Sequence, residues 1–140
     1  MAGIYIHVPF CTQRCIYCDF YSQTDERLRA DYLRAIRREL EMRADELGGE
    51  AVETIYFGGG TPSQLRAADF APIFRTIQQH YDASACREIT LEANPDDITD
   101  TYLRDLRTDL PFDRISLGVQ SFSDADLRRL NRRHDAAEAI

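Results

Sequence analysis

The chain has 140 residues, 44% of them hydrophobic and 29% charged, which is the composition of a globular domain with its own hydrophobic core. Its 24 acidic residues outnumber the 17 basic ones and give a net charge of −7. This balance argues against a nucleic-acid partner that is recognised through its phosphates. No apolar run approaches the roughly 20 residues needed to span a bilayer, so we expect no stable membrane insertion.

Strand and helix patterns alternate along the chain. Period-two alternation and β-rich composition predict four strands, over 3–9, 52–57, 88–93 and 114–119. Helical spacing of apolar residues predicts helices over about 25–47, 69–81 and 100–108, and a fourth that begins after Ser123. Thr24 is the expected N-cap of the first helix. Pro72 falls in the first turn of the second, where its missing N–H costs little. The final stretch, 135–140, is also helix-like.

Four successive strand–helix units predict parallel strands that are joined by right-handed crossovers. Natural sheets rarely leave bare edges, and four such units on their own would do so. We therefore expect an α/β fold, a partial (βα) barrel of which about the first four βα units are present. On this interpretation residues 1–140 are the N-terminal part of a barrel domain, and the remaining barrel and a C-terminal domain are absent from the sequence.

Each predicted strand ends in an unusual group of residues. A cysteine loop follows the first strand, a glycine run the second, the sequence EANP the third and GVQSF the fourth. Ligands of βα barrels and open α/β sheets bind at the C-terminal ends of the strands. The four groups are therefore expected to converge on one rim of the sheet.

Three cysteines, Cys11, Cys15 and Cys18, form the pattern Cys-x-x-x-Cys-x-x-Cys. Three thiolates complete neither a tetrahedral zinc site nor a four-cysteine cubane, but they can hold three irons of a [4Fe–4S] cluster and leave the fourth open. The alternative is a zinc site completed by His7 or Cys86, although Cys86 is more typical of a small buried residue. Cysteines grouped in this way indicate metal binding and a reducing cytoplasm instead of disulfides.

The other strand ends offer polar groups. Glycines at 58–60 permit close backbone approach and leave N–H and C=O groups free for a ligand, unless they only form a tight turn. Glu92 is expected to point into the barrel, where a cationic or hydroxyl-bearing ligand, or an internal arginine, would offset the cost of burying its carboxylate. Gln120 and Arg132 suit ligand hydroxyls and a carboxylate, respectively, though each is often structural.

The ligand that suits an open iron chelates it through nitrogen and oxygen, as the amine and carboxylate of an amino acid do. It should also carry hydroxyls and a positive charge for the polar rim. S-adenosylmethionine has all of these. Beside a low-potential cluster its sulfonium can accept one electron and break a C–S bond.

Several segments, in the same order, resemble the radical S-adenosylmethionine (radical SAM) enzymes of the oxygen-independent coproporphyrinogen III oxidase group. They are YIHVPFC at 5–11, the three cysteines, GGGTPS at 58–63, EANP at 92–95 and GVQSF at 118–122. The resemblance implies a partial (βα)6 barrel and a [4Fe–4S] cluster held by Cys11, Cys15 and Cys18. The residues it implies for cofactor contact are Tyr5, Tyr17, Gly59, Gly60, Thr61, Glu92, Gln120 and Arg132.

One position departs from the oxidase pattern. The oxidase has a further cysteine two residues after the third, whereas this chain has Phe20. Phenylalanine there is similar to the HemW-type branch of haem chaperones, which implies binding of haem or a porphyrin, a haem-accepting protein and a one-electron donor. The alternatives are oxidative decarboxylation of coproporphyrinogen III to protoporphyrinogen IX by a 5′-deoxyadenosyl radical, and a zinc-binding structural module.

Overall fold

The computed structural model describes residues 2–13, 15–19, 21–22 and 25–140. Four strands form one sheet in the order β1-β2-β3-β4, and each neighbouring pair is parallel. Their bounds are Ala2–Val8, Val52–Gly59, Glu88–Ala93 and Arg114–Leu117. The helices α1 to α4 are Arg29–Met42, Ala67–His80, Asp100–Asp109 and Asp124–Arg129. The short 3₁₀ turns η1 to η4 are Glu26–Leu28, Ala44–Leu47, Pro62–Gln64 and Pro95–Asp97.

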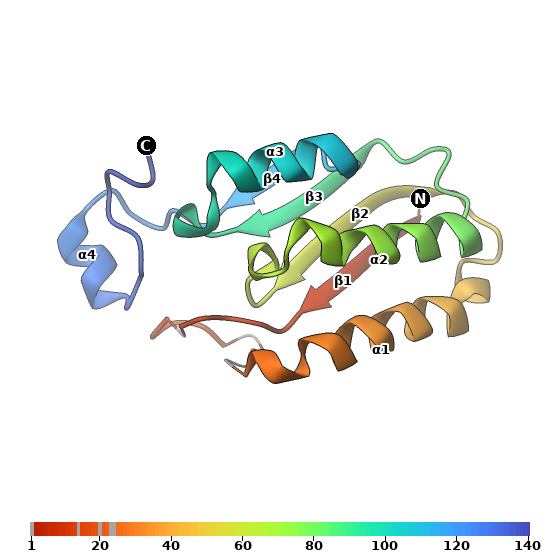
Figure 1. Cartoon of the computed structure of the whole chain (residues 1–140), viewed down its shortest axis with the longest axis horizontal. Coiled ribbons are helices and arrows are strands. Elements are labelled where there is room, and N and C mark those ends of the chain that lie inside the picture. Colours follow the sequence, from red (N-terminus) through yellow and green to blue (C-terminus); the bar gives the residue numbers. More distant parts are fainter. Residues whose placement is uncertain (1, 14, 20, 23–24) are drawn as a thin grey trace.

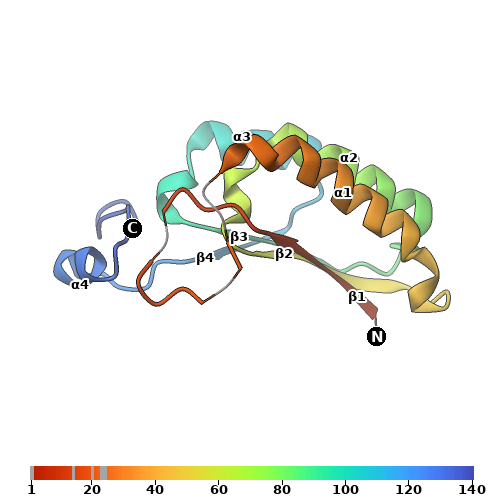
Figure 2. The ribbon, with the colours of Figure 1, turned by 90° about the horizontal axis from the view of Figure 1, so that it is seen from below.

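Helices α1, α2 and α3 all cover the same face of the sheet, and no helix of the described residues covers the opposite face (Figure 2). Strands that follow one another in sequence order, with every crossover helix on one side, form the wall of a barrel and not a doubly wound sheet. The sheet does not close on itself, because β1 and β4 are its two edges. The expected partial βα barrel of four units is confirmed.

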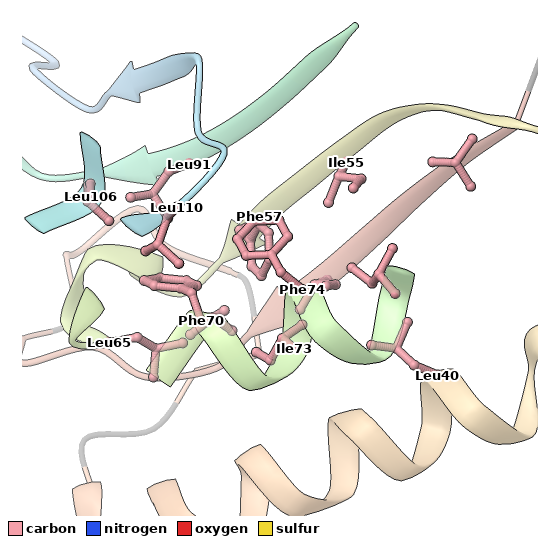
Figure 3. Close-up of a cluster of buried hydrophobic side chains, with 14 of the residues drawn as sticks. Leu40, Ile55, Phe57, Leu65, Phe70, Ile73, Phe74, Leu91, Leu106 and Leu110 are labelled. Atoms are coloured by element: carbon pink, nitrogen blue, oxygen red, sulfur yellow. The ribbon is translucent and has the colours of Figure 1, made fainter. Parts of the chain in front are cut away.

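The hydrophobic core lies between the sheet and these helices (Figure 3). Alternation along β1 sends Ile6 and Val8 into this core and leaves Tyr5 on the open face. The fully buried members from β2, β3 and α2 include Phe57, Leu91, Phe70, Ile73 and Ile77. Burial of each such side chain stabilises the fold by about 1.5–3 kcal/mol.

An aromatic cluster occupies the centre of this core. Phe57 of β2 lies edge-on to Phe70 of α2, with ring centroids 5.3 Å apart. Phe112, in the connection between α3 and β4, contacts Phe70 at 5.1 Å and Phe74 at 5.2 Å. These edge-to-face contacts join the second βα unit to the connection between α3 and β4.

Several predicted boundaries are wrong. The first predicted helix is divided: α1 ends at Met42 and η2 continues after Arg43. Helix α2 begins two residues early, because Asp69 accepts the backbone N–H of Arg66 and is the third helical residue, not the first. Pro72 therefore lies inside α2, beyond its first turn. The expected N-cap Thr24 lies outside the described residues.

The C-terminal end of the chain also differs from expectation. Residues 136–139 form turns, not the expected helix, and β4 ends at Leu117, two residues early. No helix among the described residues is long and apolar enough to cross a membrane.

All four strands point toward the same end of the molecule, where the loop that follows β1 and the segment around α4 lie (Figure 1). This end is the C-terminal rim of a parallel sheet, which is where such folds bind ligands. The position of the site is therefore set by strand direction before any side chain is considered.

Candidate functional site

A cavity of about 340 Å³ opens at this rim. Its volume is at the lower end of the range of about 300–1,000 Å³ that is typical of small-molecule sites. Segments that follow all four strands line it. The lining residues that the sequence predicted are Cys11, Cys15, Tyr17, Cys18, Gly59, Gly60, Thr61, Glu92, Gln120 and Arg132. The expected convergence of the strand ends is confirmed.

The three cysteines are free thiols that all line the cavity. Cys11 is buried. The adjacent Phe10 packs in the core edge-on to Tyr32, with the two ring centroids 5.3 Å apart. The N–H of Cys18 donates to the carbonyl of Cys15 at 3.1 Å and turns the loop back toward the cavity. Within the described part of the chain no group of three His, Cys, Asp or Glu side chains is arranged to hold a single metal ion.

The two residues considered for completing a zinc site do not line this cavity. The ring of His7 donates a hydrogen bond from Nε2 to the carbonyl of Tyr21 at 2.9 Å. Its Nδ1 lies 3.3 Å from the hydroxyl of Tyr5, within hydrogen-bond distance. Cys86 packs against the hydrophobic core and points its thiol to the carbonyl of Glu88 at 3.7 Å. The side chains of His7 and Cys86 are thus both engaged in contacts away from the three cysteines.

The cysteine loop is fastened to the end of α4. The N–H of Ile16 donates to the carbonyl of Leu130 at 3.3 Å, and the amide of Gln13 donates to the carbonyl of Asn131 at 3.2 Å. These contacts join segments more than one hundred residues apart in sequence. They make α4 part of the wall of the site.

The end of α4 has the geometry that directs Arg132 into the cavity. Asn131 adopts a left-handed conformation with φ of 59°. The N–H of Arg132 donates to the carbonyl of Leu127 at 2.9 Å, and that of Asn131 to the carbonyl of Arg128 at 3.1 Å, which is the Schellman arrangement. An asparagine just past a short helix is a sequence signal for such an end, but the sequence reasoning did not use it.

Arg132 contacts three parts of the rim. Its guanidinium donates to Oδ1 of Asn94 at 2.7 Å, to the carbonyl of Gly118 at 2.5 Å and to Sγ of Cys15 at 3.4 Å. Its Nε is buried and has no hydrogen-bond partner. A buried donor without a partner is costly, which is consistent with a site that accepts an anionic or oxygen-bearing ligand.

The glycine run is more constrained than expected. The N–H of Gly59 donates to Glu92 at 3.2 Å, that of Gly60 to the carbonyl of Val8 at 2.8 Å, and that of Thr61 to the carbonyl of Phe10 at 2.7 Å. The expectation that this run leaves its N–H groups free is therefore wrong, because Glu92 accepts that of Gly59 and the end of β1 accepts that of Gly60.

The glycines also satisfy packing demands of the protein itself. A Cβ at Gly59, whose φ is +108°, would lie 2.5 Å from the ring of His7. At Gly60 it would lie 2.8 Å from the carbonyl oxygens of Val8 and Phe10. Close approach of β1 and of the residues directly after it thus requires these two glycines.

Glu92 lies at the end of β3 on the open face, as predicted. Its Oε1 accepts the hydroxyl of Tyr56 at 2.6 Å and its Oε2 accepts the N–H of Gly59. Among the described residues it forms no ion pair, so none of them serves as the internal arginine partner considered above. Burial, and next the hydrogen bond to Glu92, raise the pKa of Tyr56 above its usual value.

Tyr5 lies beside the cavity but is not one of its lining residues. It is 57% exposed and stacks on Tyr56 with ring centroids 6.1 Å apart. Burial, followed by the charge of Glu92, raises the pKa of Tyr5. The two tyrosines thus extend the polar face of Glu92 along the open side of the sheet.

Gln120 and Tyr17 lie on the outer part of the site. Gln120 is exposed and has a positive φ of 66°, an uncommon conformation for a residue other than glycine. Such conformations cluster at ligand sites. Tyr17 is 47% exposed and lies between Cys15 and Cys18 in the cavity wall. Phe20, on which the choice between chaperone and oxidase depends, lies outside the described residues.

A second polar network, which the sequence analysis did not predict, connects the loops that follow β2 and β3 to Arg133. Asp97 accepts Ser63 Oγ and Gln64 Nε2, both at 2.6 Å. Arg133 donates to Asp97 at 3.0 Å and to Asp96 at 2.6 Å. The network connects η3, η4 and the residue after Arg132. The pair of aspartates directly after EANP was the available signal.

The fold and the site together define an open parallel βα barrel wall with a three-cysteine cluster-type site at its C-terminal rim. The chain belongs to the radical SAM superfamily, whose family model matches residues 5–140. This family in general uses a [4Fe–4S] cluster and S-adenosylmethionine. The three thiols and the polar cavity beside them have the donor chemistry that this pair requires.

Named relatives narrow the resemblance. The chain is 37% identical to the heme chaperone HemW of Mycobacterium tuberculosis, over 98% of this chain and 36% of that protein. It is 38% identical to the heme chaperone HemW of Escherichia coli, with the same two coverages. The solved coproporphyrinogen III oxidase HemN of Escherichia coli, a radical SAM enzyme, superposes with a TM-score of 0.85 at 31% identity, over 99% of this chain and 32% of that one. The chain spans about a third of the length of these proteins.

Proposed function

We propose that Cys11, Cys15 and Cys18 bind a [4Fe–4S] cluster and that S-adenosylmethionine binds in the adjoining cavity. The observation that carries this proposal is the convergence of three free thiols and the polar strand ends on one cavity of about 340 Å³. Bound together, the cluster and S-adenosylmethionine supply radical chemistry by one-electron cleavage of a C–S bond.

The charges of the cavity fit such a ligand. Glu92 is a half-buried carboxylate without a cationic partner among the described residues, so a positively charged sulfonium or ammonium group would offset its desolvation. Arg132 offers a guanidinium with a buried, unpartnered Nε to a ligand carboxylate. Gly59, Gly60, Thr61, Tyr17 and Gln120 complete the surroundings, and Tyr5 contributes from the open face.

We further propose that the protein acts as a haem chaperone of the reducing cytoplasm, which binds haem and transfers it to a haem protein, with a separate one-electron donor for the cluster. The support is the identity of 37% and 38% to two heme chaperones over 98% of this chain. Phe20, where the oxidase has a cysteine, favours the same choice.

Haem titration of the full chain under anaerobic conditions tests the chaperone proposal. The expected result is stoichiometric haem binding, with no conversion of coproporphyrinogen III when S-adenosylmethionine and a reductant are supplied. Release of 5′-deoxyadenosine and two CO₂ per porphyrinogen would instead identify an oxidase. A chain that takes up zinc, and gives no cluster signal after reconstitution with iron and sulfide, would identify the structural module.

A further inference from the structure

A chain of hydrogen bonds joins two of the three cysteines through side chains of the rim. Arg132 donates to Cys15 Sγ at 3.4 Å and to Asn94 Oδ1 at 2.7 Å. Asn94 Nδ2 donates to Thr61 Oγ1 at 3.4 Å. Thr61 Oγ1 lies 3.3 Å from Cys11 Sγ. The chain thus runs from Cys15 to Cys11 without a break.

The chemistry of the donors fixes the direction of the bonds around Asn94, and thiolate ligation of a cluster fixes the direction of the bond to Cys11. A guanidinium can only donate, so Asn94 Oδ1 is an acceptor and the amide orientation is settled. The amide nitrogen of Asn94 can only donate, so the oxygen of Thr61 accepts from it. A cluster-bound thiolate of Cys11 can only accept, so in that state the hydroxyl of Thr61 donates its proton to Cys11. Cys11 and Cys15 are both acceptors, as thiolates are.

The three cysteines are therefore not equivalent. Thr61 is 6% exposed and Cys11 is 8% exposed, so the bond between them is shielded from water. Among the side-chain hydrogen bonds of the described residues none reaches Sγ of Cys18. Within the described part of the chain, Cys11 and Cys15 each have a side-chain hydrogen-bond partner and Cys18 has none.

We propose that Asn94 and Thr61 are positioning residues that direct a hydrogen bond onto Cys11 and thereby raise the reduction potential of the cluster, which rests on the cluster binding proposed above. Reduction adds negative charge to a cluster and its thiolates, and a hydrogen-bond donor stabilises that charge. Asn94 acts through Thr61, because its amide occupies the oxygen of the hydroxyl and leaves the proton for sulfur.

A redox titration of the reconstituted full chain, followed by the spin signal of the reduced cluster without S-adenosylmethionine, tests this proposal. Thr61→Val keeps the shape of the side chain and removes the hydroxyl, so its midpoint should shift to a more negative potential. Thr61→Ser keeps the hydroxyl and should have the midpoint of the unmodified chain. Equal midpoints for Thr61→Val and Thr61→Ser would overturn the proposal.

A further variant, Asn94→Asp, tests the hydrogen-bond relay, by which we mean the path from Asn94 through the Thr61 hydroxyl to Cys11. A carboxylate cannot donate, so the Thr61 hydroxyl should turn toward it and abandon Cys11, which lowers the midpoint. In the double variant with Thr61→Val, Asn94→Asp should add little further shift, because both changes remove the same bond. A full additional shift would show that residue 94 acts by its charge alone and would contradict the relay.

Two measurements keep the outcome decidable. The first is the iron and sulfide content of the unmodified chain. If that chain assembles no cluster, the result counts against the proposed function and not against the hydrogen bonds of Asn94 and Thr61. If Thr61→Val itself does not assemble, Fe–S stretching frequencies of Asn94→Asp and Thr61→Ser decide instead. The relay predicts a shift in the first variant and none in the second, and no shift in either would overturn it.

Discussion

Tyr56 donates a hydrogen bond of 2.6 Å from its hydroxyl to Oε1 of Glu92, across the neighbouring strands β2 and β3 on the open face of the sheet. The second oxygen of Glu92 is held by the N–H of Gly59. Both bonds fix the carboxylate at the wall of the cavity without neutralising it. Glu92 is therefore a placed negative charge, available to a positively charged ligand.

This placement predicts a charge-dependent effect of Glu92→Gln. Glutamine retains the shape and can still accept from Tyr56, but it removes the charge that faces a sulfonium. Affinity for S-adenosylmethionine should fall about tenfold or more, as expected for loss of a charged contact of about 1.5–3 kcal/mol. Affinity for S-adenosylhomocysteine, which has no sulfonium charge, should fall less. Calorimetric titration of the reconstituted chain checks this, and equal losses for both ligands would refute the charge argument.

The three cysteines predict a sharp contrast among alanine variants. Cys11→Ala, Cys15→Ala and Cys18→Ala should each fail to assemble the cluster, because every thiolate holds its own iron. Cys86→Ala is the matched control and should retain it, since Cys86 packs against the core away from the cavity. Iron and sulfide analysis after anaerobic reconstitution is the measurement. Loss of the cluster in Cys86→Ala would show that the ligand assignment is wrong.

The brace formed by Arg133 predicts a measurable loss of stability. The side chains of Asp96 and Asp97 are only 14% and 10% exposed, and Arg133 contacts both. Arg133→Met should lower the free energy of unfolding by about 1–3 kcal/mol, because it leaves both carboxylates without their cation. Arg38→Met, which breaks the exposed pair with Glu41, should cost less than about 1 kcal/mol. Denaturant unfolding compares the two, and similar costs would contradict a structural role for the brace.

Two buried tyrosines predict the behaviour of the fold at alkaline pH. Burial, as the largest cause, raises the pKa of Tyr32 and of Tyr102 above the ordinary value of 10.0. Their hydroxyls donate to the carbonyls of His7 and Leu65, at 2.8 and 3.1 Å, so each is needed in its protonated form. Because the folded state holds these protons more tightly, their contribution to stability is complete below pH 10 and is lost as the pH rises above it.

Unfolding experiments between pH 8 and about 11 measure this effect. The free energy of unfolding should fall above about pH 10, and the fall should be shallower in Tyr32→Phe and Tyr102→Phe. Tyr21→Phe serves as the control, because its ring is 74% exposed. The same slope in all three variants would contradict the role of buried hydroxyls.

The sequence predicted the parts of this site that depend on local patterns. Period-two alternation placed the first strand at 3–9, within one residue of β1 at each end, and the spacing of the cysteines located the loop that lines the cavity. Parallel strands then required the four strand ends to meet, because βα units of one hand leave no other arrangement. The convergence on one cavity followed from topology and needed no side-chain geometry.

The parts that were missed depend on contacts between distant segments. The N–H groups of Gly60 and Thr61 are used by Val8 and Phe10, a pairing that a single strand does not reveal. The reach of Arg132 depends on the left-handed turn at Asn131, which a local reading could have found but did not. The partners of Arg132, which are Cys15, Asn94 and the carbonyl of Gly118, lie far from it in sequence, so no local pattern predicts them.

The most direct test of the whole account is the spin resonance spectrum of the anaerobically reconstituted and reduced chain, recorded with and without S-adenosylmethionine. The account predicts a [4Fe–4S]⁺ signal whose spectrum changes when the ligand is added, because the ligand binds beside the cluster in the cavity lined by Cys11, Glu92 and Arg132. A cluster signal that S-adenosylmethionine leaves unchanged, or no cluster signal at all, would contradict it.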